Sequence, residues 1–124
     1  MRPASPPPDF DLPVALESLR LFAALAPARL LFSHYGPVAD VAATLERSAE
    51  ELHVWVAETR RARGARLDLD HVVAMVRDRT RERYAALRPG ADPEVAAKAE
   101  TVSSTHANVE GILRWLEKTE PVAE

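Results

Sequence analysis

Apolar positions recur at helical spacing along most of the chain, and this pattern predicts a mainly helical protein. The first helix is expected from Leu12 to about Leu25, because Asp11 can cap it and Pro13 is tolerated in a first helical turn. The inward face of this helix is predicted to consist of Leu12, Leu16, Leu19 and Ala23.

Three long helices are expected to follow, over residues 40–63, 71–88 and 93–118. Gly64 ends the first, Asp70 caps the second before Pro89-Gly90 stops it, and Asp92-Pro93 opens the third. Their predicted inward residues are, in turn, Val41, Leu45, Leu52, Trp55 and Val56; Val72, Val73, Val76, Tyr84 and Leu87; and Val95, Val102, Val109, Ile112, Leu113 and Leu116.

Between the first two helices, residues 29–33 form a short apolar run bounded by Pro27 and by Gly36-Pro37. Its length and flanks favour a strand or extended segment, although a short helix has the same pattern. A strand here needs partner strands for its backbone hydrogen bonds, and the sequence shows no obvious ones.

Taken together, these elements predict a mainly α fold in three parts. Residues 1–10 are a proline-rich, extended lead-in that precedes the folded part, because proline fixes φ and has no N–H. Residues 11–37 form a helix, a strand and a turn that contains His34, and residues 38–120 form a helical bundle. The 124 residues, of which 47% are hydrophobic, are enough for one domain.

Composition excludes several classes of protein. The formal charge of −3 argues against nucleic acid as the main partner. There is no cysteine, so a disulfide framework or a thiolate metal site is excluded, and a reducing compartment is favoured. No run approaches the roughly 18 apolar residues of a membrane span, and residues 1–10 do not resemble a signal peptide. We therefore expect a cytoplasmic protein without a membrane partner.

Three of the four histidines have simple structural interpretations. His53 is expected on a helix surface, and His106 belongs to a polar stretch, 103–108, that favours an exposed turn over a polar cleft. Asp68-Leu69-Asp70-His71 ends like the His-x-His-x-Asp-His signature of dinuclear zinc hydrolases. Arg66 and Asp68 replace its two leading histidines, however, and Asp70 is better explained as a helix cap.

The fourth histidine, His34, follows the predicted strand and precedes Gly36-Pro37. Ligands and catalytic groups collect in loops at strand ends, because a rigid sheet can position them. His34 is therefore the candidate ligand of this chain.

Arginines gather at Arg60, Arg61, Arg63 and Arg66, and again at Arg77, Arg79, Arg81, Arg83 and Arg88. They could contact phosphate, but Asp78 and Glu82 lie among the second group at pairing distances. A solvated, salt-bridged helix is therefore favoured over a nucleic-acid surface. The sequence contains no glycine-rich phosphate loop and no Gly-x-Ser-x-Gly nucleophile elbow.

Nearly the whole chain resembles the C-terminal part of metallo-β-lactamase-fold hydrolases. The matching segments are Pro6-Pro7-Pro8-Asp9-Phe10-Asp11-Leu12, Ala15-Leu16-Glu17-Ser18-Leu19, Leu30-Leu31-Phe32-Ser33-His34-Tyr35-Gly36-Pro37, Glu50-Glu51-Leu52, Ser103-Ser104-Thr105, Asn108-Val109 and Gly111-Ile112-Leu113-Arg114-Trp115-Leu116. The resemblance implies that His34 is the family's last metal ligand, in a zinc site that other sequence must complete. The family's remaining ligands lie upstream of such a segment. We therefore expect no catalytic residue in the isolated chain, no tight zinc binding and no activity.

Two functions remain open at this point. The chain is either the C-terminal portion of such a hydrolase, acting on an unidentified ester, thioester, amide or phosphoester, or a non-catalytic helical module for protein interaction or dimerisation. In the first case Phe10, Phe22 and Phe32 would present an apolar face to the missing hydrolase core, and this face could also form a homodimer. In the second, the stripes around Trp55 and Trp115 would contact the partner.

Overall fold

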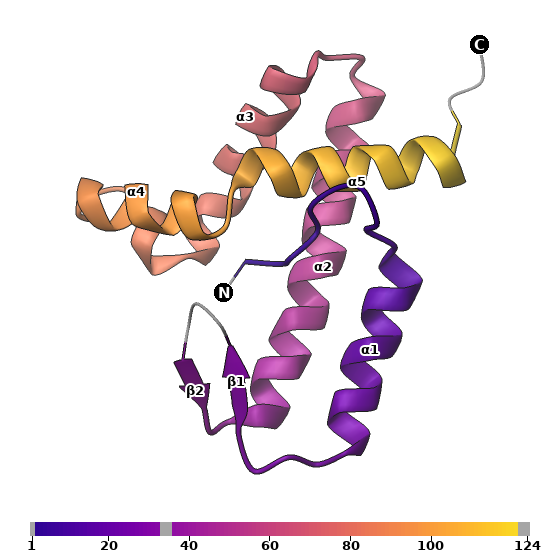
Figure 1. The fold of residues 1–124 in the computed structure, drawn as a ribbon. Coiled ribbons are helices and arrows are strands. Elements are labelled where there is room, and N and C mark those ends of the chain that lie inside the picture. The colour runs from indigo at the N-terminus through magenta and orange to yellow at the C-terminus, as the bar shows by residue number, and fades with distance from the viewer. Residues whose placement is uncertain (1, 33–35, 122–124) are drawn as a thin grey trace.

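A computed structural model describes residues 2–32 and 36–121, and it is mainly helical (Figure 1). An N-terminal helix and a short antiparallel hairpin precede the longer helices, which confirms the predicted fold class. In chain order the elements are α1 (Leu12–Ala24), β1 (Leu30–Phe32), β2 (Gly36–Val38), α2 (Val41–Gly64), α3 (Leu69–Thr80), the 3-10 turns η1 (Arg81–Arg83) and η2 (Ala85–Leu87), α4 (Pro93–Val102) and α5 (Thr105–Thr119).

Helix α2 is the centre of the fold, and α1, α3 and α5 all contact it. Figure 1 shows α5 lying across α2, with α1 alongside the other end of α2. The main core forms where α2, α3 and α5 meet, and its fully buried members include Trp55, Val72, Val76, Ile112 and Leu116. The predicted apolar stripes of these helices therefore do face the core.

The predicted strand has a partner within the chain. β1 pairs antiparallel with β2 in the register Leu30↔Val38, Leu31↔Pro37 and Phe32↔Gly36. The sequence pattern conceals this partner, because Gly36-Pro37 has the composition of a turn and Gly36 indeed has a φ of +72°. The expectation that this strand has no partner in the chain is therefore wrong, because β2 pairs with one edge of β1.

Two predicted helix boundaries are also wrong. The helix expected over 71–88 begins at Leu69 and ends at Thr80, and its cap is Asp68, not Asp70. The Asp68 side chain accepts the backbone N–H of His71, which is the standard N-cap interaction. The two 3-10 turns then continue the chain to Leu87.

The helix expected over 93–118 is two helices, broken at Ser103 and Ser104. The Ser104 side chain accepts the backbone N–H of Ala107 and so caps α5, which is why the chain starts a new helix here. Val95 and Val102 of α4 are exposed and so do not face the core as predicted, whereas Val109, Ile112 and Leu116 of α5 are buried as predicted.

The proline-rich lead-in is packed against α5 and not merely extended in front of the fold. Arg2, Pro3 and Ser5 are buried, and Ser5 bonds Asn108 through both its backbone N–H and its hydroxyl. The lead-in crosses α5 at Gly111, where a Cβ atom would lie 1.8 Å from the Ser5 carbonyl oxygen. Proline content predicts the lack of regular structure correctly, but it carries no information about this contact.

Candidate functional site

Helix α1 is apolar on two opposite sides. Leu12, Leu16 and Leu19 are half-buried on the side where α1 contacts α2, and no side chain of α1 is fully buried. Val14, Leu21 and Leu25, spaced seven and four residues apart, share the opposite side and are 64%, 52% and 76% exposed. We call these three residues the outer face of α1.

The hairpin that follows α1 in the chain also exposes an apolar side chain. Leu31 of β1 is 82% exposed, and the described part of the chain adds no third strand to the sheet. Five of the eight large hydrophobic residues exposed in residues 2–32 and 36–121 fall between positions 14 and 31: Val14, Leu21, Phe22, Leu25 and Leu31. A two-stranded hairpin is marginal by itself, and a helix that is apolar on both sides is typical of a buried layer.

Only part of the apolar face predicted from the three phenylalanines is open. Phe22 is half exposed, whereas Phe10 packs edge-to-face on Trp115 with ring centroids 5.9 Å apart. The side chain of Phe32 lies outside the described residues. The spacing of Val14, Leu21 and Leu25 forms a second apolar stripe in the sequence. A prediction based on the inward stripe alone does not include it.

The predicted metal ligand, His34, lies outside the described residues, in the segment 33–35. Within the ranges 2–32 and 36–121, no three His, Cys, Asp or Glu side chains lie close enough together to hold a metal ion. The other three histidines are exposed, on α2, α3 and α5. Of these, His71 places Nδ1 2.8 Å from Asp68 Oδ1, and its backbone and side-chain hydrogen bonds lower the pKa of Asp68.

A buried polar chain joins α2 to the segment that follows α3. Trp55 Nε1 donates to the Tyr84 hydroxyl at 2.7 Å, and that hydroxyl donates in turn to Glu51. Burial, assisted by the hydrogen bond to Glu51, raises the pKa of Tyr84, so the phenol stays protonated and remains a donor. Arg83 closes the chain by donating to Glu51 and Glu50 at 2.7 and 2.8 Å.

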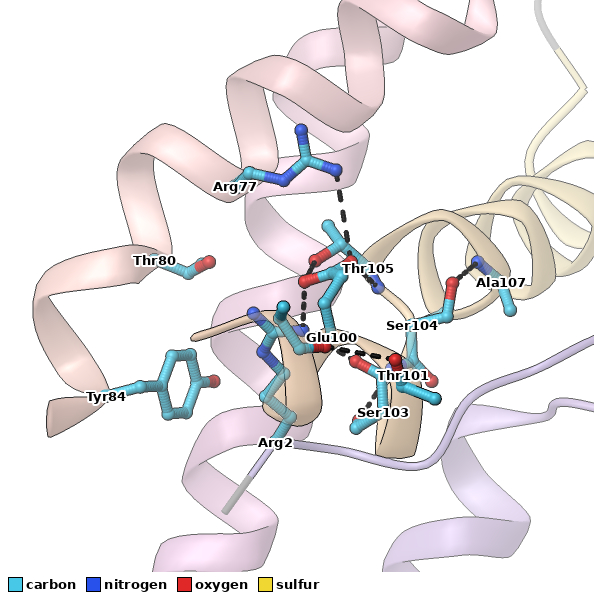
Figure 2. Close-up of polar contacts among 12 residues, drawn as sticks. Arg2, Arg77, Thr80, Tyr84, Glu100, Thr101, Ser103, Ser104, Thr105 and Ala107 are labelled. Atoms are coloured by element: carbon cyan, nitrogen blue, oxygen red, sulfur yellow. Dashed lines mark hydrogen bonds and ion pairs between the residues drawn. The ribbon is translucent and has the colours of Figure 1, made fainter. Parts of the chain in front are cut away.

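A second polar cluster ties the lead-in to the junction of α4 and α5 (Figure 2). Arg2 donates to Glu100 at 2.7 Å and to the Ser103 carbonyl at 2.6 Å, and its guanidinium lies 5.6 Å from the centre of the Tyr84 ring. Glu100 also accepts the backbone N–H and the hydroxyl of Thr105. Burial raises the pKa of Glu100, but the hydrogen bonds from Arg2 and Thr105 outweigh it and lower the pKa overall.

The five arginines between positions 77 and 88 divide into two groups according to their contacts. Arg79 and Arg83 point to α2 and bond Glu58, Glu50 and Glu51, so their partners lie on another helix and not at the interleaved Asp78 and Glu82. Arg77, Arg81 and Arg88, by contrast, line a hollow with Arg2. The sequence alone could not separate these groups, because the separation depends on which way α3 is turned against α2.

Comparison with protein-family models, with curated proteins and with solved structures finds no match to this chain. A helical fold does not by itself identify an activity, since one fold hosts many functions. None of the helices in the described part of the chain has the length and apolar character needed to cross a membrane. Because no match was found, the chain's own residues are the basis for its function.

Proposed function

We propose that this chain is the C-terminal, helix-rich portion of a metallo-β-lactamase-like hydrolase, inactive alone, and that the outer face of α1 packs against the core of that enzyme. The observation that carries the proposal is the two-sided apolar character of α1. The order of helix, hairpin and helical tail is compatible with the order of the segments through which the sequence resembles that family.

Burial of the outer face would supply a substantial free energy of association. Val14, Leu21 and Leu25 are half to three-quarters exposed, so covering them would contribute about 1–2 kcal/mol each. A core strand added to the free edge of β1 would also satisfy backbone groups that a two-stranded hairpin leaves unpaired. Both gains require a neighbour with an apolar surface and an open sheet edge, as the αββα core of a metallo-β-lactamase-like hydrolase would present.

The proposal assigns His34 to the metal site of the complete enzyme, and the other ligands to the core. The described residues do not form a metal site of their own, so no catalytic step through zinc is derived for this chain. Its contribution is to supply one ligand and a helical cover. A cytoplasmic location belongs to the same proposal, because the composition contains no cysteine.

The direct test is the intact mass of the protein isolated from the cells that make it, together with peptide sequencing. We expect a mass well above 13.7 kDa and upstream peptides that contain His-x-His-x-Asp-His. A single product of 13.7 kDa would overturn the proposal.

The docking surface has its own test, in which Leu21→Glu and Leu25→Glu are made both in the isolated chain and in the longer protein. Surface changes normally alter stability by less than about 0.5 kcal/mol, so the isolated chain should melt almost unchanged. In the longer protein both variants should lower the melting temperature by several degrees, whereas the exposed control Ala24→Glu should not. If Leu21→Glu and Leu25→Glu change the melting temperature equally in the two proteins, nothing covers the outer face of α1 in the longer protein.

The alternative function, a non-catalytic dimerisation module, would use the same face. Trp55 is fully buried and Trp115 is half-buried against Phe10, so the tryptophan stripes are not the contact surface expected for such a module. Sedimentation of the isolated chain distinguishes the two functions. A dimer that Leu25→Glu dissociates, found together with a 13.7 kDa product in cells, would favour the module.

A further inference from the structure

A hollow of about 220 Å³ lies between α3 and the segment that joins η2 to α4. Four arginines line it: Arg2, Arg77, Arg81 and Arg88. The acidic side chains of its lining are Asp78 and Glu100, and the other lining residues are alanines and Leu87. Four guanidinium groups face two carboxylates here, a formal charge of +2 in a chain whose total is −3.

The two carboxylates do not fully occupy these arginines. Glu100 is held by Arg2 and by the backbone and hydroxyl of Thr105, and Arg77 approaches it only to 3.9 Å (Figure 2). Arg81 lies 3.8 Å from Asp78, which is itself well exposed. Both separations are longer than a hydrogen bond, so the N–H groups of Arg77 and Arg81 are available to another acceptor.

The other two arginines are fixed in place. Arg2 is only 6% exposed, and its bonds to Glu100 and the Ser103 carbonyl hold it in the lining. Arg88 donates Nε–H to the Glu82 carbonyl at 3.0 Å, which orients the guanidinium and leaves its terminal nitrogens uncommitted in the described structure. Arg77 lies in the last turn of α3, and Arg81, the first residue of η1, follows four residues later as the C-cap of α3 with helical dihedral angles, so the two project from the same side on successive turns.

We propose that this hollow binds a small molecule that carries a phosphate or diphosphate group. Guanidinium forks match the oxygens of phosphate and bind them in pairs, more strongly than neutral donors do. The alanines and Leu87 of the lining add an apolar wall beside these charges. The site is independent of the docking face of α1.

Nucleic acid is the less suitable ligand for the same arginines. A strand needs a continuous basic track, but Arg79 and Arg83, which interleave with the hollow's arginines in sequence, are bonded to Glu58, Glu50 and Glu51. The arginines of the hollow are therefore gathered around a space of about 220 Å³ and do not form a continuous track.

Isothermal titration of the 124-residue chain with inorganic pyrophosphate and with inorganic phosphate, at constant ionic strength, tests this site. We expect saturable binding with one pyrophosphate per chain, and at least tenfold weaker binding for both Arg77→Gln and Arg81→Gln. The control Arg114→Gln removes the same charge from an exposed position on α5 and should change the affinity less than twofold. Circular dichroism confirms that each variant is folded.

Three results would overturn the proposal. The first is the absence of saturable binding by either anion. The second is an equal loss of affinity in Arg81→Gln and Arg114→Gln, which would indicate general charge attraction. The third is tighter binding of a single-stranded oligonucleotide than of pyrophosphate, with the same sensitivity to Arg81→Gln, which would assign the arginines to nucleic acid.

Discussion

Gly111→Ala should destabilise this protein, although the same change in a free helix would stabilise it. Gly111 lies inside α5, where alanine is favoured over glycine by about 1 kcal/mol. The lead-in crosses the helix at this position, however, and an added Cβ would meet the Ser5 carbonyl oxygen at 1.8 Å and the backbone of Pro6 and Pro7 at 2.7 and 2.9 Å.

The size of the effect follows from what must move. Cβ atoms essentially never approach another heavy atom within 3.0 Å, so the lead-in has to shift by at least about 1.2 Å. Such a shift breaks the 2.8 Å bond from the Ser5 N–H to Asn108 Oδ1, and both partners are buried. An overpacked site costs about 1–3 kcal/mol, and an unsatisfied buried polar group costs a similar amount. After the helical gain of alanine is subtracted, we expect a net loss of about 1–5 kcal/mol.

Urea denaturation, followed by tryptophan fluorescence, measures this difference. Gly64→Ala is the matched control, because Gly64 ends α2 and a Cβ there has no neighbour within 4 Å. We expect Gly111→Ala to lower the denaturation midpoint and Gly64→Ala to leave it equal or slightly higher. Deletion of residues 2–8 should reverse the sign, so that Gly111→Ala then stabilises. A higher midpoint for Gly111→Ala in the full chain would refute the packing of the lead-in on α5.

Three further predictions address the rest of the structure. Tyr84→Phe leaves the Trp55 N–H without its acceptor and removes the donor to Glu51 Oε2, while Arg83 still donates to Oε1 of the same carboxylate, so it should cost about 2 kcal/mol in urea denaturation; an unchanged midpoint would contradict the buried polar chain. The lowered pKa of Glu100 means that its ionised form stabilises the protein above about pH 4.5 and that this contribution is lost as the pH falls through the folded-state pKa. The stability deficit of Glu100→Gln should therefore shrink between pH 7 and pH 3.5, and a pH-independent deficit would exclude the ion pair with Arg2 as its cause. In the isolated chain, amide hydrogens of α1 should exchange faster than those of α2 and α5, because α1 has no buried side chain; equal protection would show that α1 belongs to the core.

Local signals in the sequence predict the helices well and their connections poorly. The stripe of α2 and the buried positions Val109, Ile112 and Leu116 follow from periodicity, because these side chains face a single core. The break before α5 depends on Ser104 as a cap and on Glu100, whose partner Arg2 is 98 residues away. No pattern along the chain reports a contact of that range.

The two candidate sites, like the connections between helices, could be predicted only in part from the sequence. The outer face of α1 was present in the sequence as the spacing of Val14, Leu21 and Leu25, but a stripe alone does not say which of two apolar sides will be covered. The arginine-lined hollow required the fold, since Arg2 joins Arg77, Arg81 and Arg88 only after the lead-in has packed beside α4 and α5.

The two halves of the chain differ in how completely they are buried, and this difference connects the two proposed surfaces. Every member of the main core comes from the region after β2, on α2, α3, α5 and the turn that bears Tyr84. That region has its own core and its buried polar chain, so it can hold Arg77, Arg81 and Arg88 of the hollow, and Glu100 and Ser103 in the same region hold Arg2 of the lead-in. Helix α1 and the hairpin contribute no fully buried side chain among those described, so their order depends more on contacts that the main core does not supply. An interface at α1 would therefore add stability where the fold has least, and it would leave the hollow, which no residue of α1 lines, free to bind its ligand.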